Sequence, residues 1–333
     1  MRVAVFKGAG KPITIDDVAD DPLAPGELRI EVGRCGICGS DISMTSGSAF
    51  DYATGCRLGH ETAGTVIERG RGVTDLKLGD RVAVIPRGYC GTCAACKAGR
   101  PIFCETGPVH FGGFAERLVV SRQSAFRFPA SLSMAEGALV EPIACGRRAF
   151  RMARLKPGDS VLVMGAGSIG LAAIYWARQL GAGRIVVATR TTARHEIALA
   201  MGADAAVTTA PDNADALARA MPAPPDFVVE ATGKVGMLHG AVEQARTGGA
   251  VVSLGMCVVA DTVLPAFNAF KEVSMHFPVG YSVEDFTETI RAFDQGAIRP
   301  EVTVSEVVKL ADLPRLMAEM RGEHSHLKVQ IVP

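Results

Sequence analysis

A regular alternation of strand-like and helix-like segments in the second half of the chain constrains its fold most. From Lys156-Pro157-Gly158-Asp159 onward, the apolar runs VLVM, RIVVA, FVVEA and AVVSLGM alternate with helix-like stretches such as IGLAAIYWARQL and ARHEIALAM. Strands and helices in this order build a parallel sheet from right-handed βαβ units. Gly181 and Gly202 stand where two of the helices should end. We therefore expect an α/β domain.

The first strand of this domain leads into a glycine-rich turn. VLVM is followed at once by Gly165-Ala166-Gly167-Ser168-Ile169-Gly170, and a helix-like stretch comes next. Glycines at this spacing let the backbone approach a pyrophosphate, and the start of the helix favours its negative charge. Such a motif is weak alone but specific between a strand and a helix. It predicts dinucleotide binding by Gly165, Gly167, Ser168, Ile169 and Gly170.

The end of the next strand bears on the choice between NAD and NADP. NAD enzymes place an acidic residue about 20 residues past the glycine motif, where it binds the ribose 2′-hydroxyl. Here Thr189 occupies that place, Arg190 follows it, and Arg194 comes four residues later. A guanidinium can bind a 2′-phosphate through charged hydrogen bonds of about 1.5–3 kcal/mol each. We expect NADP(H) to be preferred over NAD(H), unless both arginines are merely solvated helix residues.

A cluster of cysteines predicts a structural metal site. The spacing is Cys90-x2-Cys93-x2-Cys96-x7-Cys104, within a loop that we delimit as residues 88–105. Four thiolates can surround zinc at tetrahedral corners about 2.3 Å from the metal, which leaves no position open for a substrate. Iron–sulfur proteins use different spacings. The loop should therefore hold a structural zinc ion.

A third constellation lies nearer the N-terminus. Cys38, Ser40 and Asp41 lie in the segment GICGSD, and His60 and Glu61 lie in GHE. A thiolate, an imidazole and a carboxylate can hold zinc with one position left open, which is the arrangement of a catalytic site. Each short segment is ambiguous by itself, because a histidine beside a glutamate is more often structural.

The rest of the first 150 residues indicates short strands broken by glycine. The runs 27–32 and 81–85 have strand character, and the chain ends on the strand-like LKVQIV. We expect a barrel-like, largely antiparallel domain that the C-terminal segment rejoins.

Composition excludes several other classes of protein. Lys plus Arg and Asp plus Glu each number 35, so no excess of positive charge favours a nucleic acid or an anionic membrane as partner. We see no signal peptide and no apolar stretch long enough to span a membrane. The expected location is the cytoplasm, and the expected partner is a small molecule.

Taken together, these motifs resemble those of the zinc-containing medium-chain alcohol dehydrogenases, close to the sorbitol and threonine dehydrogenase branch. The resemblance covers essentially the whole chain. It rests on GICGSD at 36–41, GHE at 59–61, GDRV at 79–82, the four cysteines, GGFAE at 112–116, VEP at 140–142, the glycine motif, and EATG at 230–233. It implies a GroES-like β-barrel catalytic domain over 1–151 and 284–333. It also implies a Rossmann domain with a doubly wound parallel sheet over 152–283.

The resemblance also implies roles for individual residues. Cys38 and His60 would bind the catalytic zinc, and Glu61 or Glu141 would complete the shell, since relatives differ in which carboxylate they use. Asp41 would orient His60, and Ser40 would pass the alcohol proton outward. Many relatives carry a histidine where this chain has Ser43, which leaves the outer part of that proton path open. Thr232, Leu254, Gly255 and Met256 would lie beside the cofactor.

The substrate is the part that the sequence predicts least. An alcohol, a polyol or the matching aldehyde or ketone fits, and Phe50, Tyr52, Phe111, Phe267 and Phe270 are candidates either for lining the pocket or for core packing. Other interpretations remain open, namely an NAD-dependent polyol or secondary-alcohol dehydrogenase, a zinc-free quinone or enoyl reductase, and a non-catalytic zinc-stabilised NADP(H)-binding sensor. A homodimer or homotetramer is expected, with two zinc ions per chain.

Overall fold

The computed structural model describes residues 1–47, 52–209 and 215–333, and the chain divides into two compact units. The first unit comprises Met1–Glu141, Ser282–Gln295 and Val304–Pro333, and the second comprises Pro142–Tyr281 and Gly296–Thr303. None of the helices in these described ranges is both long and apolar enough to cross a membrane.

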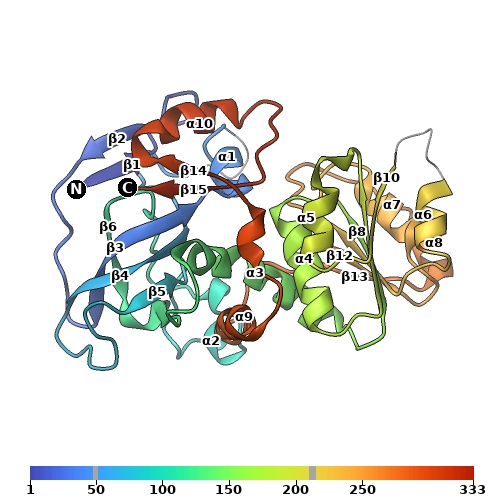
Figure 1. Ribbon diagram of the computed structural model, residues 1–333, viewed down its shortest axis with the longest axis horizontal. Helices are drawn as coiled ribbons and strands as arrows, with labels where there is room; N and C mark the ends of the chain where they lie inside the picture. The colour runs from blue at the N-terminus through green and yellow to red at the C-terminus, as the bar shows by residue number, and fades with distance from the viewer. Residues whose placement is uncertain (48–51, 210–214) are drawn as a thin grey trace. The chain divides into compact units, whose positions relative to one another are not determined.

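The first unit is built mainly of strands (Figure 1). A two-stranded sheet pairs β1 with β2, and a seven-stranded sheet has the order β14-β15-β3-β4-β5-β7, with β6 also paired to β3. The strands are β1 Arg2–Val5, β2 Thr14–Asp17, β3 Glu27–Gly36, β4 Glu61–Arg69, β5 Arg81–Val84, β6 Arg117–Ser121, β7 Ala125–Arg127, β14 Val304–Lys309 and β15 Lys328–Val332.

Most strand pairs of the first unit are antiparallel, and β14 with β15 is parallel. The C-terminal β15 pairs with β3, so the end of the chain lies beside the first part. Alternate residues of the strands, such as Leu28, Ile30 and Val32 on β3, point into one buried apolar core. This core therefore fixes the register of β3, whose last residue lies just before Cys38.

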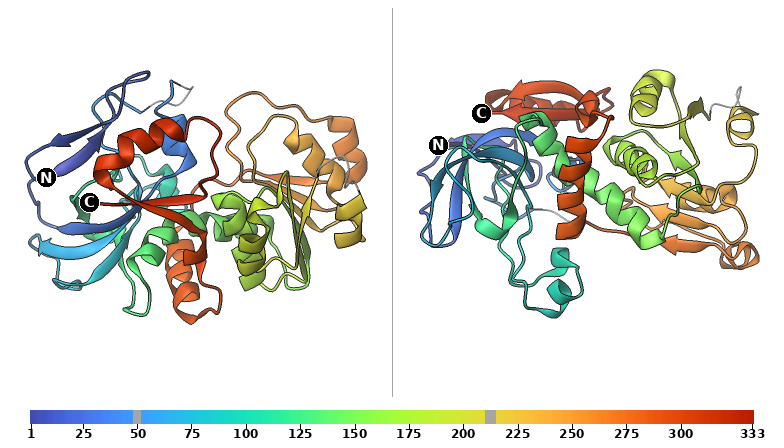
Figure 2. Two further views of the ribbon diagram at one scale, coloured as in Figure 1. Left: turned by 45° about the horizontal axis from the view of Figure 1, so that its top comes forward. Right: turned by 60° about the horizontal axis from the view of Figure 1, so that its bottom comes forward.

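Helices and short 3-10 turns complete the first unit. The helices are α1 Gly39–Ser43, α2 Ala94–Lys97, α9 Val283–Gln295 and α10 Leu313–Glu319, and the turns are η1 Pro101–Phe103, η2 Arg122–Ser124 and η6 Leu310–Asp312. Figure 2 (right) shows the cysteine-containing loop, which carries α2, projecting from the barrel. Helix α3, Met134–Ala153, belongs to both units, which divide inside it at Glu141/Pro142.

The described part of the second unit holds a six-stranded sheet in the order β10-β9-β8-β11-β12-β13. All neighbouring pairs are parallel. The strands are β8 Ser160–Met164, β9 Arg184–Thr189, β10 Ala205–Thr208, β11 Phe227–Glu230, β12 Ala250–Ser253 and β13 Ser274–His276. From β8 the strands run outward through β9 to β10, and from β11 they run outward on the other side through β12 to β13. This strand order is that of a Rossmann fold.

The helices of the second unit cover both faces of this sheet, with α4 and α5 on one face and α6, α7 and α8 toward the other (Figure 1). They are α4 Ser168–Gln179, α5 His195–Ala200, α6 Asp215–Ala220, α7 Met237–Gln244 and α8 Pro265–Lys271, and the short turns are η3 Thr192–Arg194 and η5 Pro300–Thr303. Gly181 and Gly202, with φ of 82° and 111°, follow the ends of α4 and α5 as expected. The doubly wound α/β architecture is thus confirmed.

Candidate active site and metal centres

Neighbouring strands of the first unit bring together the three residues that we expected to hold a catalytic metal. Cys38 follows β3 and caps helix α1, while His60 directly precedes β4 and Glu61 begins it. The register of the sheet places Glu61 opposite Gly36. Gly59 has a φ of 95°, and a Cβ there would meet the Phe114 backbone N at 2.6 Å. The turn that presents His60 therefore needs glycine.

The ligand atoms of Cys38, His60 and Glu61 all lie within 4.8 Å of one another. Asp41, which is fully buried, orients two of these residues. One of its oxygens accepts the Cys38 N–H at 3.0 Å, and the other lies 3.3 Å from His60 Nδ1. Because Nδ1 faces the carboxylate, His60 presents Nε2 as its metal-binding nitrogen. The sulfur, nitrogen and oxygen donors are those that zinc takes in catalytic sites.

The electrostatics of this cluster also suit a cation. Burial by itself would lower the pKa of His60, but the charge of Asp41 and hydrogen bonds with Asp41 and Cys38 raise that pKa well above its ordinary value. A site that stabilises an extra proton on a buried imidazole has an excess of negative charge. A bound metal ion would compensate that charge.

A buried lysine is the feature that sequence reasoning missed. Lys328, the first residue of β15, donates hydrogen bonds to both oxygens of Glu61 at 2.6 and 2.7 Å and to the Ile37 carbonyl at 2.9 Å. Burial acts to lower the pKa of Lys328, but the charges of Glu61, Cys38 and Glu141 raise it above the ordinary value. The signal was a lysine at the start of the strand-like KVQIV.

The neighbourhood of Glu61 leaves little room for movement. A Cβ at Gly36 would lie 2.0 Å from Glu61 Oε2, so the glycine makes space for the carboxylate. Glu141, the alternative third ligand, is the last residue of the first unit on α3. The structure groups Glu61 rather than Glu141 with Cys38 and His60. The charge of Glu141 instead acts on Lys328, where it helps to raise the pKa of the lysine.

The serines of the expected proton path lie on α1. Ser40 is half-buried, and its backbone carbonyl accepts hydrogen bonds from the Met44 N–H at 2.8 Å and the Ser43 hydroxyl at 3.3 Å. The Ser43 hydroxyl thus donates within its own helix.

Two of the aromatic residues considered for the substrate pocket lie beside the metal-binding cluster. The ring of Phe111 lies 5.7 Å from that of His60, and Tyr52 contacts Phe111 edge-on at 5.8 Å. Phe267 and Phe270 lie on α8 of the second unit, where Phe270 is 88% exposed. Phe50 lies outside the described residues. Tyr52 and Phe111 are thus the two whose positions suit a pocket wall.

The four clustered cysteines converge as a separate centre. All four sulfur atoms lie within 4.8 Å of one another. The Cys90–Cys96 and Cys93–Cys104 sulfurs are 4.0 and 3.9 Å apart. A tetrahedron with zinc–sulfur bonds of about 2.3 Å has edges of about 3.8 Å. The loop therefore has the dimensions of a closed four-thiolate zinc site.

Hydrogen bonds favour the thiolate form of two of these cysteines, since they lower the pKa of Cys90 and of Cys104. Cys90 Sγ accepts from the backbone N–H groups of Thr92 and Cys93 and from the Thr92 hydroxyl, and Cys104 Sγ accepts from the Cys90 N–H. The Thr92 hydroxyl and the two N–H groups lower the pKa of Cys90 to about 5. The thiolate is the form that binds metal.

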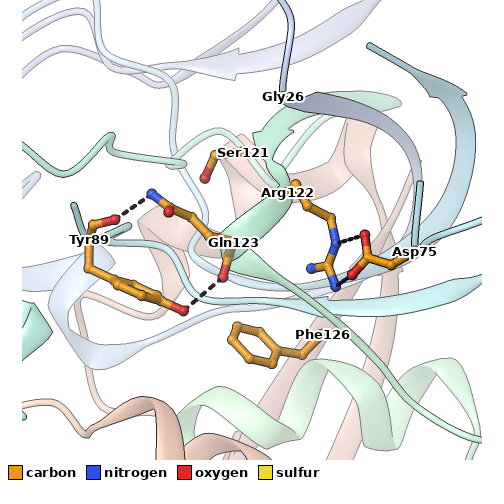
Figure 3. A pocket seen from close by; sticks show the side chains of 7 residues that line it. All are labelled: Gly26, Asp75, Tyr89, Ser121, Arg122, Gln123 and Phe126. Carbon is orange, nitrogen blue, oxygen red and sulfur yellow. Dashed lines mark hydrogen bonds and ion pairs between the residues drawn. The ribbon is translucent and has the colours of Figure 1, made fainter. Parts of the chain in front are cut away.

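A pocket of about 600 Å³ lies at the base of this loop, lined by Gly26, Asp75, Tyr89, Ser121, Arg122, Gln123 and Phe126. Figure 3 shows that Tyr89 and Gln123 exchange hydrogen bonds there and that Arg122 pairs with Asp75 through two bonds. The two charges of this pair neutralise each other, and none of the expected zinc or cofactor residues lines the pocket. Its contacts serve to anchor the loop.

In the second unit, the expected cofactor residues meet at one edge of the sheet. Gly165 follows β8, Thr189 ends β9, Thr232 follows β11, and Leu254 follows β12. Since these strands are parallel, their carboxyl ends lie at the same edge, which is where dinucleotides bind in this fold.

The glycine motif has the shape that a pyrophosphate requires. A Cβ at Gly170 would lie 2.0 Å from the Gly165 carbonyl, so Gly170 allows α4 to pack against the turn. Gly167 differs, because a Cβ there would meet nothing closer than Arg194 Nη1 at 4.0 Å. The space above Gly167 at the start of the twelve-residue α4 is open to an anionic ligand.

The loops after β11 and β12 hold each other in place. Glu230, which is 3% exposed, accepts hydrogen bonds at one oxygen from the Thr232 and Gly233 N–H groups, at 2.7 and 3.0 Å. A Cβ at Gly255 would lie 2.1 Å from the Gly233 nitrogen. Met256 follows with 73% of its surface exposed. The two loops therefore pack closely against each other, and the Gly255 N–H donates to the Glu230 carbonyl at 2.9 Å.

The residues expected to select the cofactor lie at the end of β9. The Thr189 hydroxyl contacts His195 Nε2 at 2.8 Å, and Arg194 Nη1 donates to the Ala166 carbonyl in the glycine motif at 3.3 Å. Arg190 is exposed. Thr189 thus stands where an NAD enzyme has a carboxylate, and Arg190, Arg194 and His195 follow it.

Comparisons with known proteins agree with this geometry. Residues 24–130 match the family "Alcohol dehydrogenase GroES-like domain" and residues 168–295 match "Zinc-binding dehydrogenase". Sorbitol dehydrogenase of Bacillus subtilis is 35% identical, over 100% of this chain and 97% of that protein.

Two solved structures share the fold closely. A putative zinc-binding dehydrogenase from Sinorhizobium meliloti, bound to NADP, is 29% identical, with a TM-score of 0.91 over 100% of this chain and 99% of that one. An Escherichia coli alcohol dehydrogenase complexed with NADH is 26% identical, with a TM-score of 0.90 over 100% and 99%.

The GroES-like domain and the Rossmann sheet define a zinc-binding, nicotinamide-dependent dehydrogenase. The chain belongs to the zinc-containing medium-chain alcohol dehydrogenases, in the branch that includes sorbitol dehydrogenase. It is an oxidoreductase that acts on CH–OH groups.

Proposed function

We propose that this enzyme transfers a hydride between an alcohol or polyol, or the matching aldehyde or ketone, and NADP(H), with two zinc ions per chain. The observation that carries the proposal is the convergence of Cys38, His60 and Glu61 within 4.8 Å beside the orienting carboxylate of Asp41. The domain assignment expected from the sequence is part of the proposal: the first unit is catalytic, and the second binds the nicotinamide.

Each residue of the catalytic cluster has a proposed task. Cys38 and His60 hold the zinc, and either Glu61 or Glu141 completes its protein shell. When bound, the ion acts as a Lewis acid that makes the substrate hydroxyl more acidic. Asp41 keeps the His60 ring in place, and the Ser40 hydroxyl relays the proton that the alcohol releases, accepting it while it passes its own proton outward. Tyr52 and Phe111 form an apolar wall that excludes water from this proton path.

The third ligand can be assigned by metal content. In the arrangement described, Lys328 binds both oxygens of Glu61, so Glu61 would share its lone pairs between the lysine and the metal if it is the ligand. Glu61→Gln and Glu141→Gln should be compared, each with zinc counted by mass spectrometry. The variant that falls from two zinc ions toward one per chain identifies the ligand.

For the cofactor, we propose NADP(H) because the end of β9 offers Thr189, Arg190 and Arg194 and no carboxylate. Arg190→Ala should raise the KM for NADP far more than the KM for NAD. The alternative is NAD, the oxidised form of the cofactor bound in the Escherichia coli neighbour. Equal changes in both KM values would contradict the preference.

For the assembly, we propose a homodimer or homotetramer. Strand β13 is the last strand at one side of the six-stranded sheet, and the segments next to it in sequence expose apolar side chains: Phe270 at 88% and Phe277 at 61%. Apolar surface of this kind marks an interaction site. Light scattering should give a mass of twice or four times 34.9 kDa, and a monomer would contradict the proposal.

The first experiment is a substrate screen. Primary, secondary, polyol and aromatic alcohols are supplied with NAD or NADP, with and without a zinc chelator, and reduced nicotinamide is followed by absorbance. We expect chelator-sensitive oxidation with NADP by a protein that holds two zinc ions. Bound zinc with no turnover on either cofactor would favour a non-catalytic NADP(H)-binding sensor, and chelator-resistant turnover would favour a zinc-free reductase.

A further inference from the structure

The contact between Thr189 and His195 at the end of β9 has a consequence for cofactor selection. Thr189 ends the strand, and His195 begins α5 after the short turn η3. Their side chains lie 2.8 Å apart, from Oγ1 to Nε2. The sequence singled out Thr189, Arg190 and Arg194 here, and not His195.

The direction of the hydrogen bond follows from the donors available. The Thr189 hydroxyl has one hydrogen and donates it to the Thr191 carbonyl at 2.8 Å. Toward His195 it can therefore only accept, so the hydrogen lies on His195 Nε2. The hydroxyl holds the imidazole ring in one orientation, and the second nitrogen, Nδ1, takes no part in this bond.

The same short segment also contacts the glycine motif. Arg194, adjacent to His195, donates to the Ala166 carbonyl, and the Gly165 N–H donates to the Ala188 carbonyl at 2.8 Å. The end of β9 and the pyrophosphate-binding turn are thus tied together. The adenosine ribose of a dinucleotide lies between these two features in a Rossmann fold, so the held imidazole lies on the side of its 2′-oxygen.

We propose that His195 is a ligand of the NADP 2′-phosphate, with Thr189 as the residue that positions its ring. This inference rests on the proposed use of NADP. With Nε2 bonded to Thr189, a protonated ring presents a second N–H at Nδ1, and a phosphate dianion favours that form. Arg190 and Arg194 add positive charge on the turn, and Glu196 is the acidic neighbour on α5. The ribose hydroxyl of NAD gains no comparable charged bond.

The test measures binding of two adenine nucleotides that differ in one phosphate. Adenosine 2′,5′-bisphosphate and 5′-AMP are titrated calorimetrically into the zinc-loaded enzyme at pH 7. His195→Gln should weaken binding of the bisphosphate by about 10- to 100-fold, the range of one charged hydrogen bond, and leave 5′-AMP within about twofold. Thr189→Val should weaken the bisphosphate by a smaller factor, because the ring stays but is no longer held.

A matched control uses another histidine of the same unit. His239→Gln on α7 changes a residue that pairs with Glu243, and both nucleotides should bind it as they bind the parent enzyme. If the parent enzyme prefers the bisphosphate and His195→Gln keeps that preference, the role of His195 is refuted while NADP use stands. Equal losses for both nucleotides would also refute it, because they indicate a structural role. A parent enzyme without the preference refutes the NADP proposal itself.

Discussion

Replacing Lys328 with methionine should strongly destabilise the first unit. Among the charged side chains of this site, we expect the replacement of Lys328 to have the largest effect. Lys328 is 2% exposed and Glu61 is fully buried, and the ammonium group contacts both carboxylate oxygens. Methionine keeps most of the length of the side chain and removes the charge. The buried carboxylate of Glu61 then loses the ammonium group that contacts both of its oxygens.

The size of the effect follows from the loss of one partner of a buried ion pair. Leaving the other charge uncompensated typically costs about 3–5 kcal/mol. For a domain of 150–250 residues, each kcal/mol shifts Tm by about 2–4 °C. We therefore expect the first thermal transition of Lys328→Met to fall by about 6–20 °C. Differential scanning calorimetry of the zinc-loaded protein measures this shift, with the zinc content checked before each scan.

The double variant Lys328→Met with Glu61→Gln separates charge from packing. Because the amide carries no charge, the double variant should recover a large part of the lost Tm, even though it contains one more substitution. A fall of less than about 2 °C in Lys328→Met would refute the reasoning. So would a double variant whose loss equals the sum of the two single losses, since independent sites add in that way.

Three further predictions concern other residues. Gly36→Ala should lower the zinc content of the catalytic centre, because its Cβ would lie 2.0 Å from Glu61 Oε2; unchanged metal stoichiometry would contradict this. Phe111→Ala should raise KM for alcohols with apolar substituents more than for small polyols, since it removes the ring beside His60; equal changes would show that Phe111 does not contact substrate. Burial lowers the pKa of His110 to about 4, below its value of about 6.5 in the unfolded chain. As the pH falls, the unfolded chain therefore binds a proton at this histidine before the folded protein does. The stability that His110 contributes above pH 6.5 is then lost as the pH falls toward 4. His110→Gln should flatten the dependence of Tm on pH in that window, and a parallel dependence in both proteins would contradict the shift.

Much of the architecture was predictable because it rests on local patterns. The strand–helix alternation after Lys156 predicted the parallel sheet, and the glycine motif predicted the turn between β8 and α4. The cysteine spacing predicted a compact loop whose sulfurs converge. For the turn and the loop the residues involved are close in sequence, so one segment carries the whole signal.

Helix α3 shows where local patterns were insufficient. The first 150 residues indicated short strands, yet Met134–Ala153 forms a twenty-residue helix with Pro142 inside it. Its residues Leu139, Val140 and Ile143 are buried. Burial in both units stabilises a helix whose sequence, with an internal proline, predicts it poorly.

The sequence by itself determined the class of the protein, through the family that its motifs resemble, and the four-cysteine cluster, because spacing within one motif fixes which side chains can converge. Only the tertiary structure decided that Lys328 binds Glu61 across 267 residues of chain and that the Thr189 hydroxyl holds the ring of His195. The first contact depends on β15 pairing with β3 beside β4, and the second on the fold of the turn after β9. Sheet pairing and side-chain orientation arise when distant segments pack together, so no spacing along the chain encodes them.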